Sequence, residues 1–160
     1  MAAQLVMYED EFTKINAICD RLAKDANAKV VFLVDKAGQL ISASGHTQHI
    51  DTTSLASLTA GNVAAMGGLA KLIGENEFPN QFHEGTKDSL YMTIVATRIV
   101  LVVIFDNRTS LGLVRLRIKK ASDELGRVME SMDRNANSRH EVGSPFAEIS
   151  DEDIDNLFSD

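Results

Sequence analysis

The apolar positions of this chain change period several times, and each period indicates a different kind of element. Residues 8–26 repeat apolar side chains at helical spacing and carry acids in the first turn, which predicts an amphipathic helix. Its apolar face consists of Phe12, Ile15, Ile18, Cys19 and Leu22. The runs KVVFLVD (29–35) and LISAS (40–44) are typical of strands, and the intervening DKAGQ predicts a hairpin with Gly38 at positive φ.

The pattern then predicts another helix, three more strands and a long final helix. Asp51 is the expected N-cap of a helix over residues 52–74. Three β-rich runs follow, at 80–85, 89–97 and 98–106. Thr109 or Ser110 is expected to cap a helix over residues 110–132. The residues of this helix expected to face inward are Leu113, Leu116, Ile118, Leu125 and Met129.

A change of composition near residue 132 divides the chain. The run DRNANSRHEVG (133–143) is polar and predicts a flexible segment. We therefore expect a main domain over residues 1–132, a flexible linker over 133–145 and an acidic amphipathic tail helix over 146–160. The 160 residues, 44% hydrophobic and 24% charged, provide for one globular core.

The helix over 52–74 contains AGNVAAMGGLA, with three interior glycines. Each costs about 1 kcal/mol of helix stability relative to alanine. One stripe of this helix is suited to covering a sheet: Leu55, Leu58, Asn62, Ala65, Leu69 and Leu72. A second stripe is nearly free of bulk: Ser57, Gly61, Ala64, Gly68 and Lys71. Because small side chains at this spacing let backbones approach closely, the second stripe predicts a dimer and partner-docking surface. The alternative is that this smooth face packs inside its own domain.

The tail GSPFAEISDEDIDNLFSD carries strong helix-start signals. Ser150 is an expected N-cap, Asp153 is at the capping-box position, and acids fill the first turn. A helix this short is marginal in water, so its apolar residues need a surface to rest on. We expect a tethered ligand for a groove, docking through Phe146, Ile149, Ile154, Leu157 and Phe158. A disordered, solubilising acidic end is the alternative.

Charge and cysteine content limit the classes of function. The net charge is −7, and residues 143–160 hold six acids and no base. All 16 bases and the other 17 acids lie before them, so no basic footprint for nucleic acid is present. Cys19 is the single cysteine, which favours a reducing, cytoplasmic location. The N-terminal sequence lacks signal-peptide features, and the longest apolar run (99–105) is far short of the ~20 residues that span a bilayer.

No constellation of catalytic residues emerges from the sequence, and we expect neither an active site nor a bound cofactor or metal. His46 and His49 lie in a polar loop without further ligands, so we expect solvated side chains. Cys19 is on an apolar helix face and is expected in the core. Arg108, in the loop DNRTS, has two interpretations: an arginine finger for a GTPase, or a brace for the following helix.

The order of elements, the strand–turn–strand KVVFLVDKAGQLIS and the helix TTSLASLTAGNVAAMGGLAKLIGE resemble the roadblock/LC7 domain family over about residues 5–132. The runs NEFPNQFHEG, DNRTSLGLVRLR and FAEISDEDIDNLF resemble bacterial members that activate a small Ras-like GTPase in cell polarity and gliding motility. The resemblance implies an α/β (α+β) sandwich with a five-stranded antiparallel sheet, in the order α-β-β-α-β-β-β-α. It also implies a location in the cytoplasm, concentrated at a cell pole.

The resemblance further implies partners and contact residues. It implies a homodimer formed through the second helix and the third strand, which points to Ser57, Gly61, Val63, Met66, Gly67 and Phe82. It places a GTPase on the paired helices, which points to Ala60, Gly61, Ala64, Gly68 and Lys71. The GTPase would carry the GTP or GDP and the Mg²⁺, and would rearrange its own catalytic residues on docking. Other polarity proteins are further possible partners. The alternative is a scaffold of the same family that joins complexes without changing GTP hydrolysis.

Overall fold

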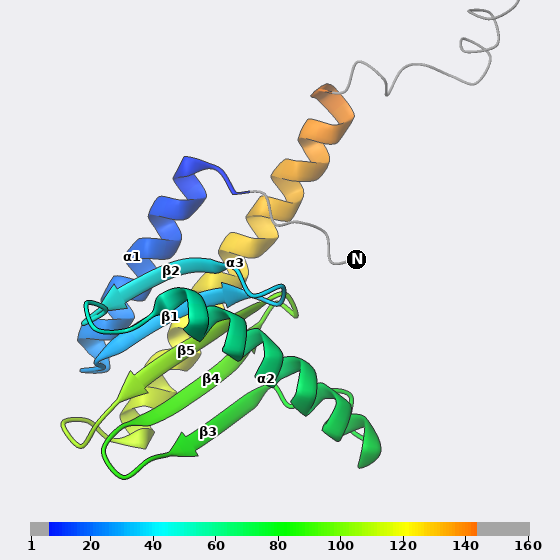
Figure 1. Cartoon of the computed structure of the whole chain (residues 1–160). Helices are drawn as coiled ribbons and strands as arrows, with labels where there is room; N and C mark the ends of the chain where they lie inside the picture. The colour runs from blue at the N-terminus through cyan, green and yellow to red at the C-terminus, as the bar shows by residue number, and fades with distance from the viewer. Residues whose placement is uncertain (1–6, 144–160) are drawn as a thin grey trace, which may run out of the picture. The chain divides into compact units, whose positions relative to one another are not determined.

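The computed structural model describes residues 7–143 of the chain (Figure 1). The chain divides into two compact units at Val128, and the first contains nearly all of the regular structure. The elements are α1 (Glu9–Asp25), β1 (Val30–Asp35), β2 (Leu40–Gly45), α2 (Thr52–Leu72), β3 (Asn80–Glu84), β4 (Ser89–Val95), β5 (Ile99–Phe105) and α3 (Leu111–Gly143). The predicted order of elements is therefore confirmed, with boundaries shifted by a few residues except at the end of α3.

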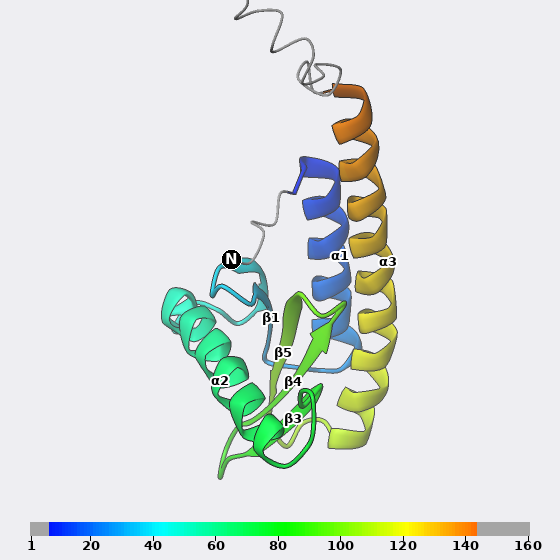
Figure 2. The same ribbon diagram turned by 90° about the vertical axis from the view of Figure 1, so that its right-hand side faces the viewer.

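The five strands form one antiparallel sheet in the order β2-β1-β5-β4-β3. The long β1–β5 ladder runs from Val30 opposite Ile104 to Asp35 opposite Ile99, and both strands are almost completely buried. In Figure 2, α2 lies on one face of the sheet, whereas α1 and the start of α3 lie on the other. Within the described residues, β2 and β3 are the edges of the sheet.

Alternation along the strands divides the core between the two faces. Val30, Phe32 and Val34 of β1 belong to a buried cluster on the α2 side. From β4, β5 and α2 the same cluster takes Met92, Val100, Val102, Ala56 and Val63. Val31 and Leu33 are also completely buried, and the period of two places them on the opposite face. Burial on both faces explains why the sequences of β1 and β5 are continuous apolar runs.

The β1–β2 turn and the start of α2 have the predicted chemistry. Gly38 has φ +95°, and Asp35 Oδ1 accepts hydrogen bonds from the backbone N–H groups of Ala37 and Gln39. A Cβ at Gly38 would lie 3.5 Å from Ser57 Cα, an ordinary van der Waals distance, so the positive φ and not the contact with α2 requires glycine here. Asp51 caps α2: its Oδ1 accepts from Ser54 N at 3.1 Å. The Ser54 hydroxyl donates to Asp51 Oδ2 at 2.6 Å, and these bonds lower the pKa of Asp51.

The structure corrects the expected sheet-covering stripe of α2. Leu55 packs against the core cluster, but Leu58, Leu69 and Leu72 are 74%, 47% and 84% exposed, so most of this stripe does not pack on the sheet. The buried residues of α2 are smaller: Ala56, Thr59, Val63 and Ala70. The valines and Phe32 of the sheet already fill most of the space under α2, so only small side chains of the helix fit against them. Leu58, Leu69 and Leu72 point away from the sheet.

The structure also corrects the predictions for the final helix. α3 continues to Gly143, so residues 133–143 are helical and not a flexible linker. Polarity alone does not end a helix, because ordinary residues differ by at most about 0.7 kcal/mol in helix propensity; the run contains neither proline nor glycine before position 143. Leu116, expected to face inward, is 63% exposed, whereas Ile118 and Leu125 are buried as predicted. Residues 144–160 lie outside the described part of the chain.

Candidate functional site

Helix α2 presents three faces, and one of them makes most of its contacts with the sheet. The sheet face carries the small buried residues named above. The small-residue face consists of Ser57, Gly61, Ala64, Gly68 and Lys71, all exposed. The heptad stripe consists of Leu55, Leu58, Asn62, Ala65, Leu69 and Leu72, of which Leu55 and Asn62 are half-buried and the other four exposed. In Figures 1 and 2, α2 is the only helix on its side of the sheet, among the described elements.

The glycines of α2 are not required by the packing of this chain. A Cβ added at Gly61, Gly67 or Gly68 would meet no atom within 4 Å, apart from neighbouring residues and helix backbone. Gly61 and Gly68 are exposed, and Gly67 is half-buried. The alternative that the smooth face packs inside its own domain is therefore wrong for the described residues. The helix stability given up at these positions has no internal compensation there.

A groove of about 390 Å³ runs beside the small-residue face. Its floor consists of Ala60, Val63, Ala64, Gly67 and Gly68. Its rim carries Lys36, Lys71, Asn76 and Glu77. Lys36 Nζ donates to Glu77 Oε1 at 2.9 Å, which ties the β1–β2 turn to the segment after α2. The predicted GTPase-contact residues thus share one open surface, with a lysine at its end. The sequence did not point to the rim residues Lys36 and Glu77, because they come from loops on either side of α2.

The predicted dimer residues do not all share one surface. Ser57 and Gly61 are exposed, and Met66 and Gly67 are half-buried. Val63 is 7% exposed, belongs to the core cluster and also lines the groove, so most of its side chain is buried within this chain. Phe82 lies on the other face of the sheet from α2, where its ring stacks on that of Phe105 with centroids 6.2 Å apart.

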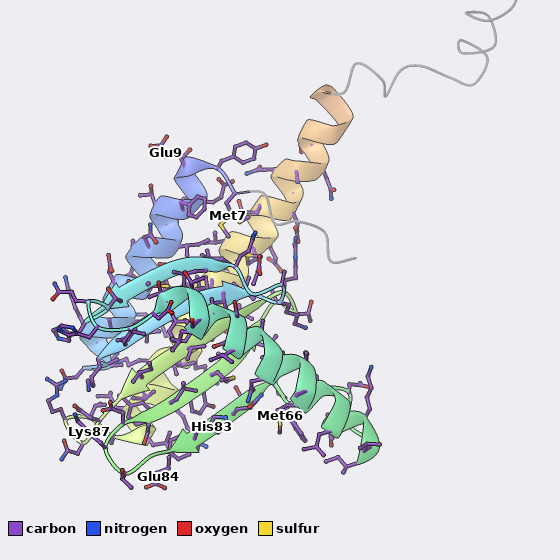
Figure 3. The ribbon with its side chains drawn as sticks, in the orientation of Figure 1. Met7, Glu9, Met66, His83, Glu84 and Lys87 are labelled. Carbon is purple, nitrogen blue, oxygen red and sulfur yellow. The ribbon has the colours of Figure 1, made fainter. Side chains whose placement is uncertain are left out.

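The edge strand β3 nevertheless faces α2 with alternate residues. Gln81 pairs with Met92, which belongs to the α2-side cluster, and His83 pairs with Leu90. Gln81 and His83 therefore lie on the α2 side, and His83 Nε2 is 3.2 Å from Gln81 Oε1. Figure 3 shows His83 on β3 and Met66 on the side of α2 toward that strand. Together they extend the exposed α2 surface to an edge of the sheet.

Arg108 braces its own loop. Asp106 Oδ1 accepts hydrogen bonds from the backbone N and the side-chain Nε of Arg108, at 3.0 and 3.1 Å. Asn27 Nδ2 donates to the carbonyl oxygen of Arg108 at 3.1 Å. The Arg108 side chain, followed by its backbone N–H, lowers the pKa of Asp106. Ser110 Oγ accepts from Leu113 N, which confirms Ser110 as the cap of α3. These contacts favour the brace over the arginine finger.

The other residues considered for chemistry do not converge. Cys19 is completely buried, and burial raises the pKa of its thiol to about 11, which makes it a poor nucleophile. His46 and His49 are exposed. Among residues 7–138, whose side chains the structure describes, no three metal-ligating side chains cluster together. None of the helices described here has the length and apolar character needed to cross a membrane. The predicted tail contacts Phe146, Ile149, Ile154, Leu157 and Phe158 lie outside the described residues.

Comparisons with known proteins agree with the fold. Residues 14–105 match the Roadblock/LC7 domain. The structure of MglB from Myxococcus xanthus is 87% identical, covering 80% of this chain and 96% of that one, with a TM-score of 0.77. Gliding protein MglB from Thermus thermophilus is 30% identical over 82% of this chain and 99% of its own, with a TM-score of 0.75.

A further structure, described as MglB with a tetrameric arrangement, is 28% identical, covers 82% of this chain and 99% of that one, and has a TM-score of 0.77. A search of curated proteins finds no match. The match to the domain extends over more than half of the chain, and the similarity to the M. xanthus protein over most of it. The chain belongs to the Roadblock/LC7 domain family.

Proposed function

We propose that this chain activates GTP hydrolysis by a small Ras-like bacterial GTPase of the MglA type, and so controls cell polarity and motility. The observation that carries the proposal is the small-residue face of α2, whose glycines are open and unused by the chain's own packing. The 87% identity to M. xanthus MglB supports an MglB-type regulatory role.

The proposed regulator is a homodimer that docks the GTPase on its paired α2 helices. Ala60, Gly61, Ala64 and Gly68 provide a surface that another backbone can approach closely, and Lys71 supplies a positive charge at its end. The chain contributes no catalytic residue of its own: the docked GTPase, which holds GTP and Mg²⁺, is shifted toward the arrangement in which its own residues are catalytic. Such a shift requires only that the regulator binds this arrangement more tightly.

The tail and the cellular location complete the proposal. The acidic segment at residues 146–160 adds a second contact to the GTPase, through the apolar side chains predicted above. The protein acts in the cytoplasm near a cell pole, where other polarity proteins join it. A second candidate function is a scaffold that binds the same GTPase without altering hydrolysis; it requires the same open face of α2.

Turnover of GTP by the partner, titrated with this chain, tests the proposal and separates the two candidates. Activation predicts a rate that rises and saturates, whereas a scaffold leaves the rate unchanged while binding is still detected. Ala64→Arg and Gly68→Arg should remove both binding and stimulation without unfolding the domain, because both positions are exposed. The matched control is Ala17→Arg on the exposed side of α1. Normal stimulation by a folded Ala64→Arg, Gly68→Arg double variant would refute the assignment.

A further inference from the structure

A hollow of about 280 Å³ lies on the side of the sheet opposite α2, between the strands β3 and β4 and the first half of α3. Met92 belongs to the α2-side cluster, so its neighbours Tyr91 and Thr93 point to the other face, which α3 covers (Figure 2). The buried side chains of Tyr91 and Ile118 form the apolar part of the lining. Six polar residues form the rest: Asn80, Thr93, Arg115, Lys119, Ser122 and Asp123.

Two cations of this lining have no anionic partner. Arg115 and Lys119 are exposed, lie about one helical turn apart, and form no ion pair among the described residues. Arg115 Cζ lies 5.7 Å from the centroid of the Tyr91 ring. This cation–π contact positions the guanidinium over the buried ring, while its N–H groups remain available to an anion.

Two neutral groups beside these cations also lack a partner. Ser122 Oγ is shielded from solvent and has no hydrogen-bond partner among the described residues. Asn80 Oδ1 accepts a hydrogen bond from Thr93 Oγ1 at 2.8 Å, and this bond leaves the Nδ2 hydrogens of Asn80 without a partner in the described part of the chain. Because a shielded hydroxyl without a partner is unfavourable, Ser122 favours a hollow that is filled by a polar group.

Asp123 adds an acceptor to the same row of side chains. Arg115, Lys119 and Asp123 follow one another at intervals of four residues, and each interval is about 6 Å of helix. Asp123 is exposed and forms no ion pair among the residues that the structure describes. Two positive charges followed by one negative charge match a molecule with a dianionic group at one end and a cationic donor at the other. A phosphate monoester carries a charge of about −1.5 to −2 at pH 7, whereas a carboxylate carries only one negative charge.

We propose that this hollow binds a small phosphomonoester that also carries an amino group. Arg115 and Lys119 bind the phosphate, and Asp123 binds the amino group. Ser122 Oγ and Asn80 Nδ2 supply neutral donors to the phosphate. The volume of about 280 Å³ is close to the lower end of the range for small-molecule sites, about 300–1,000 Å³, so it suits a compact ligand. The inference does not rest on the proposed function, because the hollow and α2 are on opposite faces of the sheet.

Isothermal titration calorimetry of the full chain tests the class of ligand. The compound 2-aminoethyl phosphate has both groups and should bind saturably. Ethyl phosphate lacks the amino group and should bind more weakly, and ethanolamine lacks the phosphate and should not bind. Glycerophosphoethanolamine carries a phosphodiester with one negative charge, as membrane lipids do, and should bind about tenfold more weakly than 2-aminoethyl phosphate. Equal or tighter binding of this diester would overturn the assignment to a monoester and point to a lipid headgroup.

Substitutions of exposed side chains test the assigned contacts. Arg115→Met and Lys119→Met keep an aliphatic side chain and remove the charge, so each should weaken the binding of 2-aminoethyl phosphate about tenfold. The matched control is Lys120→Met, because Lys120 is exposed on the same helix and does not line the hollow. This control should change the affinity less than twofold. Asp123→Asn should remove the preference for 2-aminoethyl phosphate over ethyl phosphate without weakening the binding of ethyl phosphate.

Three results would overturn the inference. The first is the absence of saturable binding at millimolar concentrations of 2-aminoethyl phosphate. The second is unchanged binding in Lys119→Met. The third is equal weakening by Lys119→Met and Lys120→Met, because the phosphate would then respond to the general positive charge of α3 and not to the hollow. Circular dichroism confirms that each variant is folded. If Arg115→Met unfolds because its contact with Tyr91 is lost, Lys119→Met and its control still decide the outcome.

Discussion

Replacing Gly68 with alanine should stabilise the isolated chain and weaken its action on the GTPase. The added Cβ would meet no atom within 4 Å in this chain, and the residue is in the interior of a regular helix. The free energy of unfolding should therefore rise by about 1 kcal/mol, the difference in helix propensity between glycine and alanine. For a domain of this size, that gain corresponds to a melting temperature about 2–4 °C higher.

Two other glycines provide matched controls for the same measurement. Gly126 is in α3, and its added Cβ also meets no atom within 4 Å. Gly126→Ala should give the same gain in stability and leave GTP turnover unchanged. Gly38 has φ +95°, a conformation that L side chains rarely adopt, so Gly38→Ala should lower stability. The stabilities come from urea denaturation, and the turnover from a titration of the GTPase with each variant.

The comparison of Gly68→Ala with Gly126→Ala isolates the effect on the partner. If close approach is the function of the small-residue face, only Gly68→Ala should require a several-fold higher concentration for half-maximal stimulation. A destabilised Gly68→Ala would mean that the fold itself requires this glycine, contrary to the open space around it. Equal stimulation by both stabilised variants would refute close backbone approach at position 68.

Three further predictions concern the fold and the tail. Leu125→Ala should lower the free energy of unfolding by about 2–5 kcal/mol, because Leu125 is buried. Leu116→Ala should change it by no more than about 0.5 kcal/mol, because Leu116 is exposed. Equal losses of stability in urea denaturation would contradict the assigned face of α3. Asp51→Ala should lower the melting temperature at neutral pH. The difference in melting temperature from the native chain should shrink as the pH falls below 3.8, because the folded-state pKa of Asp51 is lowered and protonation removes the benefit of the charge. Asp51→Asn should keep the cap without this pH dependence. Ending the chain at Gly143 should leave the melting temperature unchanged and reduce affinity for the GTPase in a binding titration; unchanged affinity and turnover would refute docking by the tail.

Local chemistry made most of the fold predictable. The hairpin follows from a turn in which Asp35 accepts two backbone hydrogen bonds and Gly38 takes positive φ. Asp51 and Ser110 cap their helices as their sequence contexts predict. The position at which α3 ends could not be predicted from local sequence signals. Low hydrophobicity indicates that a segment is not needed in the core, and it does not indicate whether the backbone continues as a helix.

The candidate site was predictable in composition but not in orientation. The sequence identified the glycines and the two stripes of α2, and both stripes exist as continuous faces. It could not show that a third set of α2 residues makes the main contact with the sheet, because that depends on the size of the side chains on the strands opposite. Leucines are ordinarily the buried residues of a surface helix. Here Ala56, Val63 and Ala70 take that role, so the predicted dimer residue Val63 is largely buried within this chain.

A helix that contacts its own sheet and is proposed to contact two further proteins has no side left for a polar face. In α2, the small buried residues meet the sheet, and the two exposed faces are the surfaces that we propose for the homodimer and the GTPase. Lys71 is accordingly the single charge in 21 residues, and ordinary amphipathic patterning gives no clear orientation. The two stripes also divide the requirements of assembly: bulky leucines bury apolar area, and glycines permit close approach. One stripe could not satisfy both, since a leucine side chain at position 61 or 68 would hold a partner's backbone away. Separate faces therefore allow the dimer to form first and still present an open surface to the GTPase.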